Sequence, residues 1–432
     1  MENHYLDAPP PPTRSARFGS LWRHRDFMRL WVGQTISQFG STVTREALPY
    51  TAILALHASP VQMGLLNAAS TAPLLILGLF AGVWVDRLRR RPLMIAADLG
   101  RALLLCSIPF AFLMGWLHIA QLYFVAILAG ILTVFFNVAY HTALPTLLAH
   151  EDLVEGNSKL GISDALAEIA GPPVGGALVQ FISGPLTLLL DAISFLCSAV
   201  LLARIRTPEP PPAPPVAQPR VWPELVAGLG VVWANPLLRA MASSSAIRNF
   251  FGWFFGAIYG LYAIRVLGFG TATLGLVVAC GGIGSFLGAL VAAPVARRCG
   301  IGPAIVSALL ISAGGSALIW LAGASAALAL PLMVASQIVG DAAMTVASIH
   351  QLSLRQTTTP DHMLGRVSAA MQVLGEGIGT LGMLTGGIMA ELIGLRPTVG
   401  VAVLGIAVGS LWALATPLRH QHILPNQPPK QV

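Results

Sequence analysis

Residues 78–101 read GLFAGVWVDRLRRRPLMIAADLGR, a short basic segment between two long apolar runs. Arginine occupies four of the five positions from 87 to 91, and Asp86 directly precedes them. An apolar run, a basic link and a second apolar run are typical of a helical membrane protein, in which Lys and Arg accumulate in short cytoplasmic links. The composition of the whole chain supports this interpretation.

The chain is too apolar for a soluble protein of its size. Of its 432 residues, 55% are hydrophobic and 10% are charged, whereas a typical soluble protein has about 25% charged residues. A membrane-spanning helix needs about 20 mostly apolar residues. We therefore predict an all-α polytopic membrane protein with twelve transmembrane helices, at residues 27–56, 63–84, 93–117, 119–143, 162–182, 185–203, 241–264, 271–295, 303–323, 328–350, 367–393 and 398–418.

The distribution of basic residues predicts the orientation. With the N-terminus inside, most Lys and Arg residues fall in the inner links, and the outer links hold only Arg265 and Arg396. We therefore expect both termini in the cytoplasm. The net charge of +7 is accounted for by this topology and by the anionic inner leaflet. It gives no reason to expect a nucleic-acid partner.

A Pro-rich segment, PEPPPAPPVAQP at residues 208–219, falls between the sixth and seventh predicted spans. It predicts an extended, semi-rigid linker, and the residues after it predict an amphipathic helix along the inner surface. A shift of 209 positions aligns His141 with His350 and Gly156 with Gly365, which favours a duplicated six-helix half. The expected organisation is a cytoplasmic tail at 1–26, six-helix bundles at 27–203 and 241–418 joined by a linker at 204–240, and a tail at 419–432.

Two parallel six-helix halves are typical of a secondary transporter, whose substrate site lies between the halves near mid-membrane. The sequence contains no G-x-x-x-x-G-K-[ST] phosphate loop and no HExxH or GxSxG signature. Its four cysteines are scattered, without metal-ligand spacing. We therefore expect no enzyme activity, no metal and no cofactor. The expected partners are a small-molecule substrate and the lipid bilayer, with the protein acting as a monomer.

The link between the second and third spans resembles the signature loop of the major facilitator superfamily. The residues that carry this resemblance are Gly82, Asp86, Arg87, Arg90 and Arg91, and the link departs from the family pattern where Arg89 replaces a second glycine. Longer stretches, among them GPPVGG at 171–176, LDAISFL at 190–196 and LRQTTTPDHMLGRV at 354–367, are similar to the branch of enterobactin exporters and of macrolide and other multidrug efflux proteins. The resemblance implies a bacterial inner-membrane exporter of bulky, amphipathic molecules, driven by the proton gradient.

The resemblance also implies a role for the basic link as a cytoplasmic gate. Asp86 and its basic neighbours would hold the two halves together and release them as the transporter reorients. The alternative is a purely topological anchor. Asp98 and Arg101 are spaced i, i+3, so we expect them to pair on one face of the third span and to support this region.

Ionisable residues within the predicted spans are candidates for proton coupling. An isolated charge at a helix centre costs about 2.5–3.5 kcal/mol, so each such residue needs a partner or a function. A buried carboxylate can bind and release a proton between two conformations. The ordered candidates are Glu46, Asp341, Glu376 and Glu168, and the alternative for each is a structural hydrogen bond or ion pair.

Other residues of the spans are candidates for the substrate cavity. Arg45 is either a counter-ion or an anchor for an anionic substrate group. Aromatic residues recur at helical spacing along the seventh span and would stack against flat, amphipathic substrates if that face lines the cavity. The alternative is that they face lipid or other helices. The cavity candidates are Arg45, Arg248, Trp253, Phe255 and Tyr259.

Together these observations predict a proton-coupled exporter of an amphipathic small molecule, either a siderophore or a drug, that works by alternating access. An importer or exchanger on the same fold and a lipid flippase remain alternatives.

Overall fold

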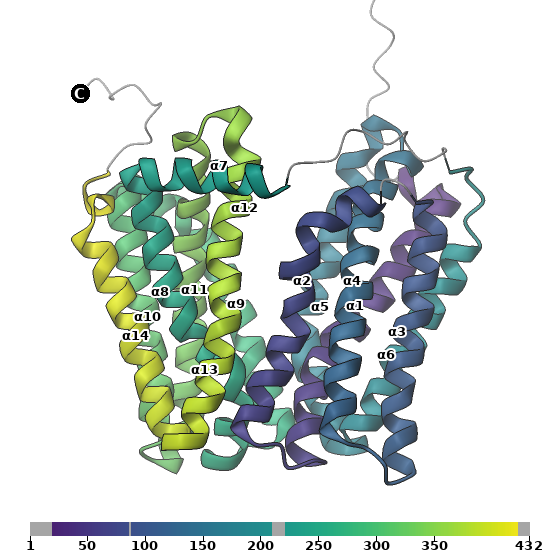
Figure 1. The fold of residues 1–432 in the computed structure, drawn as a ribbon, viewed down its shortest axis with the longest axis horizontal. Helices are drawn as coiled ribbons and strands as arrows, with labels where there is room; N and C mark the ends of the chain where they lie inside the picture. Colours follow the sequence, from purple (N-terminus) through teal and green to yellow (C-terminus); the bar gives the residue numbers. More distant parts are fainter. Residues whose placement is uncertain (1–19, 86–87, 210–220, 422–432) are drawn as a thin grey trace, which may run out of the picture.

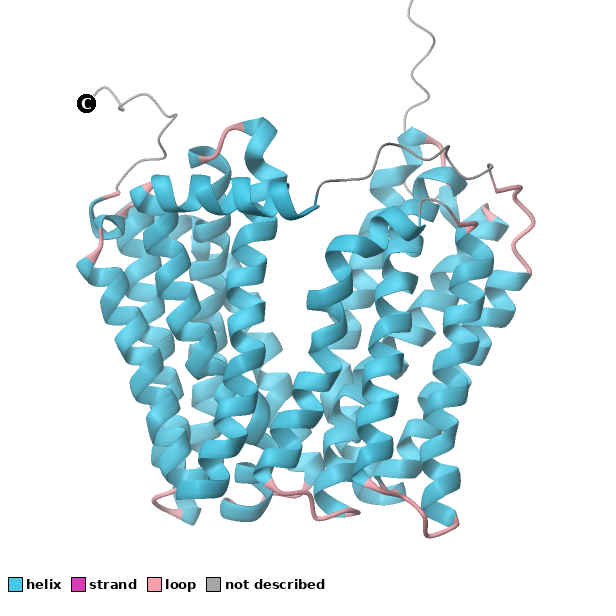
Figure 2. Ribbon diagram, viewed as in Figure 1, coloured by secondary structure: helices cyan, strands magenta, loops and turns pink. Residues whose placement is uncertain are grey.

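The described structure, a computed structural model, consists of helices joined by short links. It covers residues 20–85, 88–209 and 221–421, and within these ranges no strand is formed (Figure 2). The first half contains α1 (Arg25–Leu54), α2 (Pro60–Val85), α3 (Arg90–Leu113), α4 (Ile119–Leu147), α5 (Leu153–Ile182) and α6 (Gly184–Ala203). The second half contains α8 (Pro236–Leu261), α9 (Thr271–Cys299), α10 (Ile301–Ala322), α11 (Ala326–Thr358), α12 (Leu364–Gln372), α13 (Ile378–Ile393) and α14 (Leu395–Ala415).

The helices form two bundles side by side, one from each half of the chain (Figure 1). In the first bundle α1 packs on α5 and α6, and α3 packs on α4 and α6. In the second bundle α8 packs on α13 and α14, and α10 and α9 both pack on α11. The predicted fold class, two six-helix bundles in an all-α membrane protein, is therefore confirmed.

The helices correspond to the twelve predicted spans, but not all of them are apolar enough to be recognised as membrane-spanning by composition. In the described part of the chain, ten helical segments are long and apolar enough to cross a membrane, with α12 and α13 forming one of them, and α8 makes an eleventh when it is taken with the helix before it. The twelfth, α1, has 30 residues but is too polar to meet the same criterion because it carries charged and polar residues along its length.

The linker helix α7 (Val221–Ala234) meets α8 at an angle of 106°, as expected for a helix that lies across the end of the bundle (Figure 1). The sequence explains the bend. The side chain of Asn235 accepts hydrogen bonds from the N–H groups of Leu237 and Leu238 at 2.9 and 3.3 Å, and Pro236 occupies the first turn of α8. An Asn cap followed by Pro begins a new helix and ends the old one. We refer to the end of the molecule that carries α7 as the linker end and to the opposite end as the far end.

The two bundles contact each other mainly through α5 with α9 and α2 with α13. Glycines permit a backbone-to-backbone approach at both places. A side chain at Gly176 of α5 would collide with the backbone oxygen of Thr271 at the start of α9, and one at Gly64 of α2 would place its Cβ 2.6 Å from the backbone oxygen of Met383 on α13. The Thr271 hydroxyl also donates a hydrogen bond to the Gly176 oxygen at 2.8 Å.

Polar contacts add to these glycine contacts at the same end of the molecule. Arg265 donates to the backbone oxygen of Ala58 at 2.8 Å, and the N–H of Ala272 donates to Gln180 at 3.1 Å. The ribbons of the two bundles approach each other at the far end and diverge toward the linker end (Figure 2). The structure is therefore closed at the far end.

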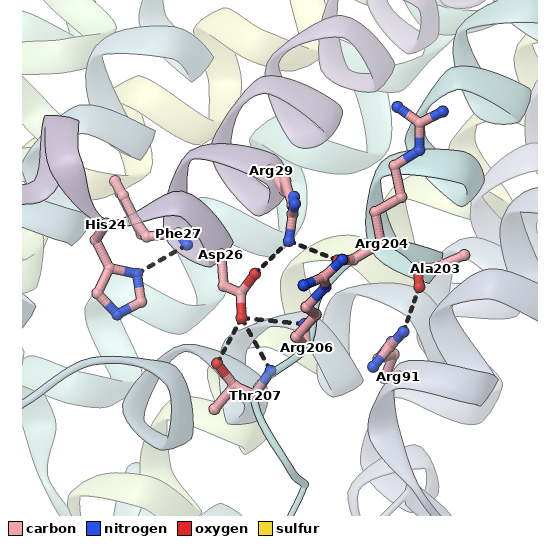
Figure 3. A network of polar contacts seen from close by, with 9 residues as sticks. All are labelled: His24, Asp26, Phe27, Arg29, Arg91, Ala203, Arg204, Arg206 and Thr207. Atoms are coloured by element: carbon pink, nitrogen blue, oxygen red, sulfur yellow. Dashed lines mark hydrogen bonds and ion pairs between the residues drawn. The ribbon is translucent and has the colours of Figure 1, made fainter.

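The start of the linker is fastened to the first bundle by a polar network at the linker end (Figure 3). One oxygen of Asp26 accepts hydrogen bonds from the N–H of Arg206 and from the N–H and hydroxyl of Thr207, at 3.0, 2.9 and 2.7 Å. Its other oxygen pairs with Arg29 at 2.7 Å, and Arg29 also donates to the backbone oxygen of Arg204 at 2.6 Å.

These contacts control the ionisation of Asp26, which precedes the first predicted span. Burial alone would raise the pKa of its carboxyl, but the hydrogen bonds from Thr207, Arg206 and Arg29 outweigh burial and lower the pKa from 3.8 to about 2. The stabilisation is therefore present above about pH 4 and is lost as the pH falls through about 2. A difference of nearly two pKa units corresponds to about 2 kcal/mol.

We expect Asp26→Asn to release the linker start at neutral pH. An amide cannot accept these bonds as a charged group does, and about 2 kcal/mol corresponds to a roughly 30-fold larger open population. Trypsin should therefore cleave after Arg204 or Arg206 faster by up to this factor, while the control Glu224→Gln on α7 should cleave at the wild-type rate. With pepsin, the ratio between variant and wild type should approach one near pH 2. A ratio that does not change between pH 4 and pH 2 would contradict the assignment to Asp26.

We expect Gly176→Val to open the far end, because a side chain there meets the backbone of α9 and overpacking costs about 1–3 kcal/mol. The closed population should fall by roughly 5- to 150-fold. The measurement is the distance between spin labels at Trp116→Cys and Ala324→Cys, in a background without the native cysteines. Gly161→Val is the matched control, since a Cβ at Gly161 of the same helix meets no atom within 4 Å. An unchanged distance distribution in Gly176→Val would refute the role of this contact.

Candidate functional site

A cavity of about 470 Å³ lies within the second bundle, between α8, α10, α11, α14 and the turn before α13. Three charged side chains line it, and they are Arg248, Asp341 and Glu376. Amides, hydroxyls and aromatic rings complete the wall, including Asn249, Gln337, Ser312, Ser316, Ser336, Trp253 and Phe255. A concave site of this size, mostly apolar with a few convergent polar groups, is typical of a small-molecule site.

Glu376 lies in a break of the eleventh predicted span. The sequence predicts one helix over 367–393, whereas the structure has a π-helical turn at Val373–Gly377 between α12 and α13. Glycines at 375 and 377 flank Glu376, and a π turn within a helix frequently marks a functional site. The turn places the exposed Glu376 side chain on the cavity wall.

Asp341 is placed by a glycine of the neighbouring helix. A Cβ at Gly281 of α9 would collide with Oδ2 of Asp341 and would lie 3.3 Å from Nε2 of Gln337. The carboxylate therefore occupies the space that the missing side chain leaves. Gly281 belongs to a group of glycines in α9 that permit close helix packing in a membrane.

Arg248 lines the same cavity but directs its nitrogens into the helix packing. Its Nη1 donates to the backbone oxygen of Leu309 at 3.2 Å and to the Ser410 hydroxyl. Its Nη2 donates to Ser312 at 3.2 Å and contacts the sulfur of Met344 at 3.7 Å. With 8% of its surface exposed, Arg248 ties α8 to α10 and α14.

Glu46 and Asp341 come from different bundles, and Tyr259 of α8 interacts electrostatically with both. Glu46 accepts a hydrogen bond from Tyr50, one turn later in α1, at 2.9 Å. The hydroxyl of Tyr259 is buried and has no hydrogen-bond partner. A polar layer of Glu46, Tyr50, Tyr259 and Asp341 therefore crosses the boundary between the bundles.

Arg45 and Glu168 form a bidentate ion pair between α1 and α5, with N–O distances of 3.0 and 2.8 Å. Both side chains are more than half exposed, at 58% and 52%, although they lie well inside predicted spans. Charged groups at this depth are tolerated where they face a water-filled cavity. The exposure of the pair is therefore what a water-filled space beside α1 and α5 would require. In this structure the ion-pair partner of Arg45 is Glu168.

Asp164 lies one turn before Glu168 on α5 and interacts electrostatically with Glu168 and with His141. The sequence prediction did not include Asp164 among its candidates. The signal was present, because Asp164 falls inside the predicted span 162–182 and is spaced i, i+4 from Glu168.

Asp98 and Arg101 pair with each other on one face of α3, but they lie inside the first bundle, eight and eleven positions after Arg90, the first residue of the helix. Both are buried, with 0% and 3% of their surfaces exposed. The Arg101 guanidinium lies between the rings of Phe136 and Phe195, at 4.5 and 4.1 Å from their centroids. Their place in the structure is therefore the core of the bundle and not its surface at the linker end.

The basic link after α2 is described only in part. Gly82 falls within α2, whereas Asp86 and Arg87 lie outside the described residues. The backbone N–H groups of Arg90 and Arg91 both donate to the carboxylate of Glu209, the second at 3.3 Å, and the Arg91 side chain donates to the backbone oxygen of Ala203. Glu209 therefore caps α3, where a negative charge also suits the helix dipole. These contacts join the link to the linker within one half.

Comparison with known proteins agrees with this architecture. The sequence model of the Major Facilitator Superfamily matches residues 30–383. The multidrug efflux pump Tap of Mycolicibacterium fortuitum is 30% identical over 373 residues, which cover 83% of this chain and 88% of that protein. The enterobactin exporter EntS of Salmonella typhimurium is 25% identical over 392 residues, covering 86% and 87% of the two chains.

Solved structures show the same fold at lower sequence identity. A bacterial homologue of the iron transporter ferroportin in an inward-facing state has a TM-score of 0.71 at 16% identity, over 90% of this chain and 98% of that one. The nucleoside transporter NupG has a TM-score of 0.71 at 14% identity, over 92% and 99% of the two chains. The predicted family and the prediction of a protein that is not an enzyme are confirmed. This chain, with two six-helix bundles and a family match over most of its length, is a transporter of the Major Facilitator Superfamily.

Proposed function

We propose that this transporter is a proton-coupled exporter that moves an amphipathic small molecule across the bacterial inner membrane as a monomer, with its linker end and both termini in the cytoplasm. Tap and EntS are named as an efflux pump and an exporter, which supports the direction. The surplus of basic residues in the links at the linker end supports the orientation.

The observation that carries the mechanism is the polar layer across the bundle boundary. Glu46 belongs to the first bundle and Asp341 to the second, and Tyr259 of the second bundle interacts electrostatically with both. When the bundles rock about the far end, the surroundings of Glu46 change, because its interaction with Tyr259 crosses the boundary between the bundles. Protonation removes a charge whose stabilisation differs between the two states, and a ligand shifts an equilibrium by the difference of its affinities for the two states.

The driving force is sufficient for this role. Moving one charge through 100 mV is worth about 2.3 kcal/mol, and each unit of pH difference adds about 1.4 kcal/mol. One proton per cycle therefore shifts the balance between the two states by a factor of several tens. The far-end contacts of α5 with α9 and of α2 with α13 would close one state and separate in the other.

The basic link would form the gate of the second state. In the described state Arg90 and Arg91 contact Glu209 and Ala203 of their own half. We propose that this region, with Asp86 and Arg87, approaches the second bundle when the linker end closes. Asp98 and Arg101 act in this proposal by fixing the position of α3 within its bundle.

Transport in everted vesicles tests this function. An imposed inside-acid gradient should drive solute accumulation by the wild type, and Glu46→Gln or Asp341→Asn should lower it at least tenfold, because the proton can no longer be exchanged. Exchange of labelled for unlabelled solute without a gradient should persist in Glu46→Gln, which separates lost coupling from lost folding. Glu151→Gln, in the short turn before α5, is the control. Retained gradient-driven accumulation after all four acids (Glu46, Glu168, Asp341 and Glu376) are changed to amides would refute proton coupling through them.

The position of Asp341 is tested without changing the residue itself. We expect Gly281→Ala to displace the Asp341 carboxylate and to lower gradient-driven transport several-fold, since an added methyl group meets Oδ2 directly. Gly314→Ala on α10 is the matched control, because a Cβ there meets no atom within 4 Å. Wild-type transport by Gly281→Ala at wild-type expression would show that the carboxylate position is not critical.

A further inference from the structure

The charges of the predicted proton-coupling and cavity residues do not balance. With Asp164 included, carboxylates outnumber guanidinium groups among them by five to two. The carboxylates are Glu46, Asp164, Glu168, Asp341 and Glu376, and the guanidinium groups are Arg45 and Arg248. An excess of negative charge in a site of low dielectric constant favours a cationic ligand over an anionic one.

The two guanidinium groups are already engaged by the protein. Arg45 places both Nη nitrogens on the two oxygens of Glu168. Arg248 places its Nη nitrogens on Leu309, Ser410, Ser312 and Met344 within the helix packing. An anionic solute would have to displace one of these contacts to bind an arginine, and the remaining carboxylates would repel it.

The two carboxylates of the second bundle that line the cavity are not engaged in this way. Within the described ranges, no Lys or Arg nitrogen lies within ion-pair distance of Asp341 or Glu376. Arg248 of α8 lines the cavity with both acids, and Tyr259 of α8 interacts electrostatically with Asp341. Both acids line the 470 Å³ cavity. A cation there would gain two carboxylate partners without breaking an existing ion pair.

Aromatic side chains give the same cavity a second recognition element. Trp253 and Phe255 of α8 line it. The indole of Trp253 is fixed against α13, since a Cβ at Gly379 would collide with the indole. A held aromatic face binds flat rings by stacking and cations by their attraction to the ring electrons.

We propose that the cavity binds an aromatic solute with one amine or quaternary ammonium cation, placing the cation near Asp341 and Glu376 and the ring near Trp253. This proposal rests on the proposed function and names the solute class of the same site. It favours a cationic drug-like solute over an anionic, catecholate-type siderophore. Because the solute and the proton use the same carboxylates, each lowers the affinity for the other, and this reciprocal effect is the requirement for antiport.

Equilibrium binding to the purified, detergent-solubilised full-length protein tests the solute class. The probes are ethidium, a permanent aromatic cation, and fluorescein, an aromatic anion of similar size, followed by fluorescence anisotropy. We expect ethidium to bind at least tenfold more tightly than fluorescein, with an affinity that falls as the solution is acidified, because a protonated carboxylic acid no longer attracts a cation. Equal or tighter binding of fluorescein, or binding of neither probe, would overturn the proposal.

Variants of Asp341, Glu376 and Trp253 test whether ethidium binds at these residues. Asp341→Asn and Glu376→Gln should each weaken ethidium binding about tenfold and flatten its pH dependence, whereas Asp341→Glu should restore most of the affinity. Trp253→Ala should weaken binding several-fold at all pH values, and Glu151→Gln should leave it unchanged. Ethidium binding that is unaffected in the double variant of Asp341 and Glu376 would place the cation elsewhere and refute the site. If Asp341→Asn does not fold, Glu376→Gln and the pH dependence of the wild type give the same decision.

The binding experiment needs no membrane gradient, so it can fail independently of the export proposal. Ethidium that binds in competition with protons but is not accumulated by everted vesicles would refute proton-coupled export and leave the solute class intact. Gradient-driven accumulation of fluorescein without accumulation of ethidium would refute the solute class and leave export intact.

Discussion

The arrangement of the two bundles depends on backbone contacts at the far end. Where α5 meets α9 and α2 meets α13, glycines bring one helix against the backbone of the next. Contacts of this kind gain their stability from close packing, since apolar side chains gain little by leaving lipid for protein. These helix contacts are stable only when the two surfaces fit closely, so they form or separate together. Such an interface favours two discrete arrangements of the bundles over a continuous range of arrangements.

The interior of the first bundle has a different character. Asp98, Arg101 and Asp191 are all buried, and Arg101 lies between two aromatic rings. Removing one partner from a buried ion pair typically costs about 3–5 kcal/mol. Such a group strongly opposes rearrangement within the bundle. Rigid bundles and an all-or-none contact between them are complementary, because together they confine movement to the boundary between the bundles.

The sequence allowed the helices, their number and the division into two halves to be predicted, because these depend on long apolar runs, short basic links and a Pro-rich insertion. The ends of the helices were predicted less accurately. The helix α5 begins at Leu153, nine positions before its predicted span, since its first turns carry a Glu155–Lys159 pair and hydropathy registers only the apolar part. The π turn at Glu376 was not predicted either, because hydropathy does not register a change of helical winding within an apolar run. The charged residues of the cavity could be identified as unusual, but their partners depend on which helices adjoin. Arg45 pairs across 123 positions of the chain, and Arg248 binds backbone and hydroxyl groups that no spacing rule identifies.

The π turn at 373–377 has a consequence for the linker helix. A π turn accommodates one residue more than an α-helix of the same rise, so converting it into regular α-helix would rotate α12 by about 100° relative to α13. The helix α7 packs on α12 through a close approach of Gly228 to the backbone of Arg366 and would be carried with it. Glu376 lies within this turn. A local change of helical winding beside the cavity would thus move α7 along the end of the bundle.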